Sequence, residues 1–160
     1  MRFRWKRFAL GLLGAFVLVQ FIPVKKTNPA VDPAQTLWAS GLVPTGFQTI
    51  FQRSCKDCHS NLTTWPWYSH VAPVSWMVTS DVNGGRSHFN IDEWGKYSSE
   101  KKQSRFTKIC EELKSGEMPD TKYTLIHRSA GLTAQERTEM CSWAEAARQT
   151  LVRAEAAGHP

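Results

Sequence analysis

The feature that most constrains this chain is the pentapeptide Cys55-Lys56-Asp57-Cys58-His59. Its Cys-x-x-Cys-His spacing places two thiols about one helical turn apart, with an imidazole directly behind the second. In c-type haem attachment each thiol adds across one vinyl group of the porphyrin, and the adjacent histidine presents a ring nitrogen to the iron. The motif therefore predicts one covalent haem c held through Cys55 and Cys58, with His59 as the proximal ligand. The competing interpretations are a structural zinc site and a dithiol pair.

The N-terminus is basic and then apolar. Four bases precede the run from Phe8 to Val24, and no small-x-small cleavage site follows it. As a helix this run would span roughly 25 Å, close to the thickness of the hydrocarbon core of a bilayer. Residues 1–26 are therefore predicted to form an uncleaved signal anchor rather than a removed signal peptide. The charge bias predicts a single-pass protein of the bacterial inner membrane whose haem domain faces the periplasm.

The net charge of +6 resides in this leader. Residues 1–26 hold six bases and no acid, so 14 bases face 14 acids in the remainder of the chain. A formally neutral globular part lacks the basic surface that nucleic acids require. We expect no nucleic-acid partner.

Prolines and apolar periodicity divide the rest of the chain. Residues 27–36 contain two prolines and are predicted to form an extended linker. Residues 37–152 are predicted to form one haem-binding domain, and residues 153–160 a flexible tail.

Three one-sided apolar patterns predict helices in this domain. The first runs from about Thr45 into the Cys-x-x-Cys-His motif, the second from Ser99 to a stop at Gly116, and the third from a capping box at Thr133 to Leu151. The expected fold class is all-α.

Aromatic side chains crowd the segment Ser60–Val78. Trp67, Tyr68 and Trp76 are candidates to wall a flat hydrophobic cofactor, although an ordinary aromatic core explains them equally well. Arg86, in a turn-like Asn-Gly-Gly-Arg sequence, is a candidate partner for a haem propionate, and a solvated loop arginine is the alternative.

A second ligand for the iron is expected from Glu117-Met118-Pro119. Pro119 restricts Met118 to an extended backbone, which keeps this loop out of the preceding helix and lets the thioether be aimed at the cofactor. His/Met ligation is one arrangement known in cytochromes c. The alternative distal ligand is His127 in the same loop, and a methionine that fills a gap in the core is the purely structural interpretation. Lower-ranked ligand candidates are His70, Met77 and His88.

Two cysteines remain after the haem has taken Cys55 and Cys58. Cys110 and Cys141 both lie on predicted helices. If these helices pack together, a disulfide would close a loop of about 30 residues and contribute roughly 3–4 kcal/mol. Two buried thiols are the alternative.

Several runs of the sequence resemble the bacterial haem-binding-domain family, a cytochrome c-like group with a single Cys-x-x-Cys-His. The runs are CKDCHSNLTTWPWYSHVAPVSWMVTSDVNGGR, NIDEW, ICEELKSGEMPDTKY and LTAQERTEMCSWA. The resemblance covers roughly Val43 to Ala147. It implies a haem c bound through Cys55, Cys58 and His59, with Met118, at the matching Met-Pro position, as the distal ligand.

The expected function is single-electron transfer by a membrane-anchored, class I cytochrome c-like domain. His59 and Met118 would fill both axial positions, and the partners would be periplasmic or membrane redox proteins. The alternative is a haem-based enzyme or a gas or redox sensor whose distal ligand is open or displaceable. The sequence shows no paired carboxylates, nucleophile triad or phosphate loop, so catalysis would rest on the sixth ligand alone. An electron carrier or haem-binding protein is therefore favoured over a catalyst.

Overall fold

The computed structural model describes residues 2–158, with side chains from residue 4 onward. Met1 and residues 159–160, the outer ends of the predicted anchor and tail, lie outside this range. The described residues form helices and turns and contain no strand, which confirms the all-α prediction. The α-helices are α1 (Arg2–Val19), α2 (Thr45–Ser54), α3 (Lys56–His59), α4 (Val74–His88), α5 (Ser99–Ser115), α6 (Thr121–Ile126) and α7 (Ala134–Ala156). The short 3-10 helices are η1 (Pro33–Gln35), η2 (Leu37–Ser40), η3 (Trp67–His70), η4 (Ile91–Lys96) and η5 (Arg128–Ala130).

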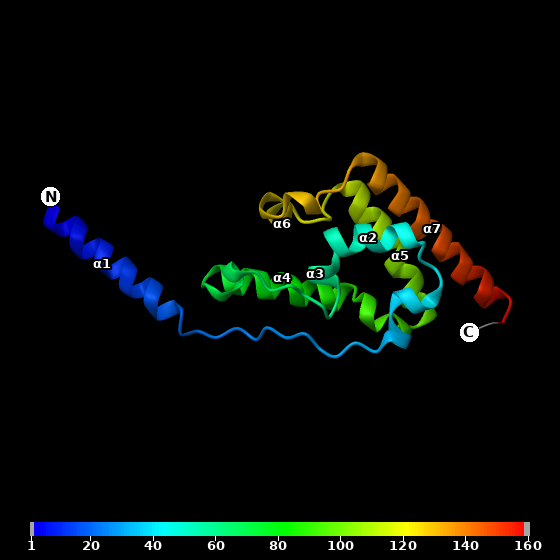
Figure 1. The fold of residues 1–160 in the computed structure, drawn as a ribbon, viewed down its shortest axis with the longest axis horizontal. Coiled ribbons are helices and arrows are strands. Elements are labelled where there is room, and N and C mark those ends of the chain that lie inside the picture. The colour runs from blue at the N-terminus through cyan, green and yellow to red at the C-terminus, as the bar shows by residue number, and fades with distance from the viewer. Residues whose placement is uncertain (1, 159–160) are drawn as a thin grey trace.

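The two longest helices of the domain, α5 and α7, pack antiparallel (Figure 1). At one end Arg137 of α7 donates to the carbonyl oxygen of Leu113 of α5, and at the other end Gln103 donates to Glu155. Local sequence sets where each helix begins and ends. The Ser98 hydroxyl accepts from the Lys101 N–H at the start of α5, and a glycine with φ of 78° follows its last turn. The predicted capping box begins α7.

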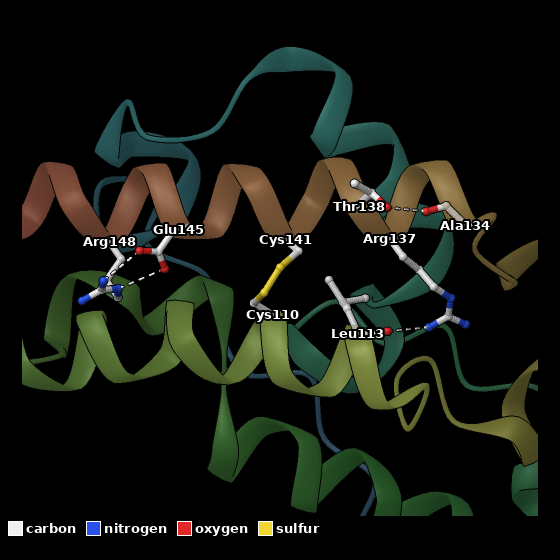
Figure 2. The surroundings of a disulfide bond; sticks show 8 residues. All are labelled: Cys110, Leu113, Ala134, Arg137, Thr138, Cys141, Glu145 and Arg148. Carbon is white, nitrogen blue, oxygen red and sulfur yellow. Dashed lines mark hydrogen bonds and ion pairs between the residues drawn. A yellow bond between two sulfur atoms is a disulfide. The ribbon is translucent and has the colours of Figure 1, made fainter.

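A disulfide joins the middles of these helices (Figure 2). It links Cys110 of α5 to Cys141 of α7, so the predicted pairing is confirmed. The adjacent core is closed by Phe106, which is fully buried and packs edge-on against Trp143 at a ring-centroid distance of 5.4 Å. The covalent and apolar contacts thus make α5 and α7 one rigid wall of the domain.

The opposite wall is formed by α4 and the short helices before it. The chain that leaves α3 is tied to η4 by buried polar contacts: the N–H of Asn61 donates to the Asp92 carboxylate at 2.7 Å, and Asn90 donates to the Asn61 side chain at 2.8 Å. The short helices η1, η2 and η4 also pack together, and Leu37, Ile91 and Trp94 form the buried core between them. This layer gives the motif segment a fixed base.

The N-terminal helix α1 projects away from the domain (Figure 1). In residues 2–158 no helix combines the length and the apolar character needed to cross a membrane. Four of the 18 residues of α1 are basic, and the helix ends at Val19. The apolar part after Arg7 therefore covers only about 18 Å, against roughly 30 Å of hydrocarbon. The predicted transmembrane anchor and the inner-membrane location are wrong.

The segment after α1 is bound to the domain. Gln20 exchanges two hydrogen bonds with the backbone of Ala72, at 3.1 and 2.9 Å, and Lys26 donates to the carbonyl oxygen of Ser69 at 3.0 Å. The predicted linker, residues 27–36, is likewise held down and contains η1. At the other end, α7 continues to Ala156, four residues into the predicted tail, because an uninterrupted run of helix-forming residues follows Leu151.

The disulfide gives the first testable prediction. Replacing both Cys110 and Cys141 with serine should lower the free energy of unfolding by roughly 3–4 kcal/mol, because the bond closes a loop between residues 31 apart. Urea unfolding followed by circular dichroism measures the change. The unsubstituted protein in reducing agent should lose a similar amount, and an unchanged midpoint in both samples would contradict the prediction.

Candidate cofactor site

The Cys-x-x-Cys-His motif occupies a single helical turn. The N–H groups of Cys58 and His59 both donate to the carbonyl oxygen of Cys55, at 3.2 and 3.0 Å, which brings the two thiols and the imidazole together. This turn packs against α4. A Cβ placed on Gly85 would lie 2.4 Å from the Cys58 carbonyl oxygen, so the close approach of the two helices requires glycine at this position.

The motif faces a cavity of about 590 Å³, a size suited to one cofactor-sized ligand. Cys55, Cys58, His59 and Met118 all line it, although they come from segments about 60 residues apart. Most of the remaining lining surface is apolar and is contributed by α2, α5, α7 and the chain around them. These apolar residues include Trp38, Val43, Phe47, Phe51, Ile109, Leu113, Met140 and Trp143.

The imidazole of His59 is positioned as a metal ligand. Its Nδ1 lies 2.9 Å from the carbonyl oxygen of Phe89. Because a carbonyl oxygen only accepts, Nδ1 carries the proton and Nε2 keeps its lone pair for a metal. Burial is the main cause that lowers the pKa of His59, so the ring stays neutral, as a ligand requires.

The two thiols of the motif are free and protonated. Burial raises the pKa of Cys55 to about 12 and that of Cys58 to about 11. A redox dithiol typically has a lowered thiol pKa, so the environment is opposite to the one a reactive pair needs. Within the described residues no three His, Cys, Asp or Glu side chains form a cluster that could hold a metal ion. Neither competing interpretation of the motif gains support.

Met118 is held by its backbone from two directions. Its N–H donates to the carbonyl oxygen of Glu112 at 3.3 Å, and its own carbonyl oxygen accepts from Arg137 Nη1 at 2.8 Å. The side chain is 38% exposed. The end of α5 and the first turn of α7 thus bring a thioether to the cavity that His59 also lines.

The aromatic residues predicted to wall the cofactor do not line the cavity. Trp67 is 79% exposed, and Trp76 lies on α4 outside the lining. Tyr68 instead hydrogen-bonds through its hydroxyl to Nε2 of His127 at 2.5 Å. That contact also occupies the nitrogen that would make His127 a distal ligand. The sequence shows that these aromatic residues follow the motif closely, but it does not show the direction in which η3 and α4 orient their side chains.

Arg86, the candidate partner for a propionate, also lies outside the cavity lining. Its guanidinium donates to the carbonyl oxygens of Ser60 and Thr27, at 2.8 and 2.7 Å, and to the hydroxyl of Thr63 at 2.8 Å. The predicted turn is in fact the last part of α4. Arg86 therefore fastens the N-terminal segment to the chain after the motif.

Two cavity residues, Tyr123 and Arg105, were not among the sequence-based candidates. Tyr123 of α6 donates to the Asp57 carboxylate at 2.9 Å, which joins the loop of Met118 to the motif turn. Arg105 of α5 lines the cavity, and its buried Nε has no hydrogen-bond partner. A pair of free thiols, a neutral imidazole, a thioether and an unsatisfied guanidinium N–H in one apolar cavity fit a haem with its vinyl groups, iron and carboxylates. No sequence motif marks Tyr123 or Arg105, because both meet the cavity only through helix packing.

Comparisons with known proteins agree with this geometry. Residues 14–146 match the family described as "haem-binding domain". The Escherichia coli K12 protein "Cytochrome c peroxidase Ccp" is 25% identical over 95 residues, which cover 58% of this chain. The chain spans only 20% of the length of that protein. No solved structure matches.

The contact at Gly85 generates the second prediction. Gly85→Ala should lower the free energy of unfolding by about 1–3 kcal/mol and reduce the yield of haem-loaded protein, because the methyl group collides with backbone of the motif turn. Gly84→Ala, one residue earlier on the same helix, has open space around the new methyl group and is the matched control. It should stabilise α4 by about 0.5–1 kcal/mol. Equal effects of the two substitutions in urea unfolding would contradict the role given to Gly85.

Proposed function

Because the chain belongs to the haem-binding domain family, we propose that it holds one haem c covalently and transfers single electrons between redox proteins as a class I cytochrome c-like domain. The observation that carries the proposal is the shared cavity of Cys55, Cys58, His59 and Met118. Two thiols suit attachment to two vinyl groups, and nitrogen and sulfur donors suit the two axial positions of an iron.

Each residue has a defined part in this proposal. Cys55 and Cys58 anchor the porphyrin, and the Phe89 carbonyl orients His59 so that Nε2 is available. Arg137 and Glu112 hold the backbone of Met118. When bound, the haem supplies an iron that exists as Fe(II) or Fe(III), which is what one-electron transfer needs.

The cavity walls favour electron transfer in a second way. Aromatic and aliphatic side chains from α2, α5 and α7 dominate the lining, so a cofactor bound there would have a largely apolar environment. A low-dielectric site disfavours the more charged ferric state and raises the reduction potential. Rigid cavity walls would also limit the structural change that accompanies a change in the charge of the iron.

A second candidate function is a haem enzyme or a gas or redox sensor. Two observations favour it: Met118 is 38% exposed and so is not fixed in a packed core, and a matched relative is named as a peroxidase. This chain spans a fifth of that relative, so the match need not include the part that reduces peroxide. We rank this candidate second because a methionine in the sixth position would block substrate binding at the iron.

The covalent attachment is the third prediction. The haem of the full-length protein, produced in a host that matures c-type cytochromes, should stay with the polypeptide on extraction with acidified acetone. A Cys55→Ser and Cys58→Ser double variant should lose it. Free haem in the acetone layer from the unsubstituted protein would contradict covalent binding.

The sixth ligand is the fourth prediction. Met118→Ala should abolish the sulfur-to-iron charge-transfer band of the ferric protein and allow the ferrous protein to bind carbon monoxide, because the distal position opens. Met77→Ala is the control, since Met77 is 50% exposed and lies outside the cavity lining. Ready carbon monoxide binding by the unsubstituted protein would instead favour the enzyme or sensor.

A further inference from the structure

The wall of the cavity carries a guanidinium N–H that no described residue accepts. Arg105 lies on α5 and lines the cavity, and its Nε is buried without a hydrogen-bond partner. A buried donor without an acceptor costs free energy, and each such group calls for an explanation. An acceptor supplied by the bound cofactor provides one.

Neighbouring cations are already engaged. Lys108, one turn further along α5, also lines the cavity, but its amine is exposed and bonds the exposed Glu111 at 2.6 Å. Arg137 is committed to the carbonyl oxygens of Met118 and Leu113, and Arg86 to oxygens outside the cavity. Arg105 thus differs from these three by having an open donor that lies on the cavity wall.

The charges around the thiols show where an anion would be repelled. Asp57, Asp81 and Asp120 all line the cavity and lie close enough to Cys58 to interact electrostatically with its thiol, so this end of the cavity is acidic. The porphyrin of haem carries its two vinyl groups on one side and its two carboxylates on the opposite edge. With the vinyl groups at Cys55 and Cys58, the carboxylates point away from the acidic end.

The helical periodicity of α5 places Arg105 on the cavity wall, two turns before Leu113. Arg105, Ile109 and Leu113 recur at intervals of four residues and all line the cavity. Arg105 is therefore about 12 Å along the helix axis from Leu113, after which the chain turns to Met118. Arg105 and Met118 therefore lie at different parts of the cavity wall, so one cofactor could contact both through different groups.

We propose that Arg105 binds a carboxylate of the porphyrin through a charge-assisted hydrogen bond. This inference rests on the haem-binding function proposed above and names the residue that recognises the anionic edge of the cofactor. A planar guanidinium suits a carboxylate because its N–H groups match the two oxygens. The same contact removes the unsatisfied donor of the cavity wall.

The test compares two porphyrins on the full-length, haem-free protein with reduced thiols. Mesoporphyrin IX has ethyl groups in place of vinyl groups, so it cannot react with Cys55 or Cys58, and its dimethyl ester lacks the negative charges. Fluorescence titration should show Arg105→Gln binding the free acid about 10- to 100-fold more weakly, with the ester unaffected. Arg105→Lys should recover part of the loss.

Arg148→Gln is the matched control. It removes one positive charge from α7, where Arg148 pairs with Glu145 and is not part of the cavity, and it should leave both affinities unchanged. An equal loss of acid and ester in Arg105→Gln, or no loss of either, would overturn the role of Arg105. If neither porphyrin bound the unsubstituted protein, the proposed function would fail together with this inference.

A second measurement covers the case in which haem-free Arg105→Gln loses its helical circular dichroism. In the haem-loaded variant the reduction potential should be lower, because a positive charge that disfavours ferric iron is gone. The pH at which the potential responds to ionisation of the carboxylate should rise by about 1–3 units, since its cationic partner no longer stabilises the charged form. A potential and pH profile equal to those of Arg148→Gln would overturn the proposal.

Discussion

The contact of the motif turn with α4 is the constraint on which the site depends. Glycine at position 85 lets the backbone of Cys58 approach α4 closely. Four residues later, the Phe89 carbonyl oxygen accepts a hydrogen bond from the Nδ1–H of His59. One helix end thereby sets both the position of the thiols and the tautomer of the imidazole. The Asn61–Asp92 bond then fastens the chain that leaves the motif, so the proximal side of the site is assembled from contacts within 31 residues.

The opposite side depends on long-range packing. Met118 reaches the cavity because the disulfide and Phe106 hold α5 against α7. Arg137 of α7 also donates a hydrogen bond to the carbonyl oxygen of Met118. Tyr123 adds a direct bond from this loop to Asp57 of the motif. The two candidate axial residues are thus supported by different parts of the fold.

Charge is distributed unevenly around an otherwise apolar cavity. Carboxylates gather near Cys58, whereas Arg105 offers an unsatisfied donor on α5. If haem binds as proposed, the carboxylates near Cys58 favour an orientation with its neutral edge at the thiols and its anionic edge toward Arg105. Membership of the haem-binding domain family and this polarity support the same cofactor from independent directions. The peroxidase relative adds no assignment of chemistry, since it is matched over a fifth of its length.

The sequence by itself determined what depends on short-range spacing. The motif and the capped helices were readable because helical periodicity and capping act over a few residues. The Cys110–Cys141 disulfide could be predicted only on the condition that the two helices pack together, since its cysteines are 31 residues apart. The orientation of side chains relative to distant segments was decided only by the tertiary structure. Arg86 was assigned to the cofactor yet bonds Thr27, 59 residues away, while Arg105, in a plain polar stretch, lines the cavity. The apolar composition of the N-terminal run likewise predicts a membrane span, but its helix ends at Val19. The next residue, Gln20, hydrogen-bonds to the backbone of Ala72. Hydrogen bonds and packing between remote segments leave no periodic trace in a single sequence, so only the folded chain reveals them.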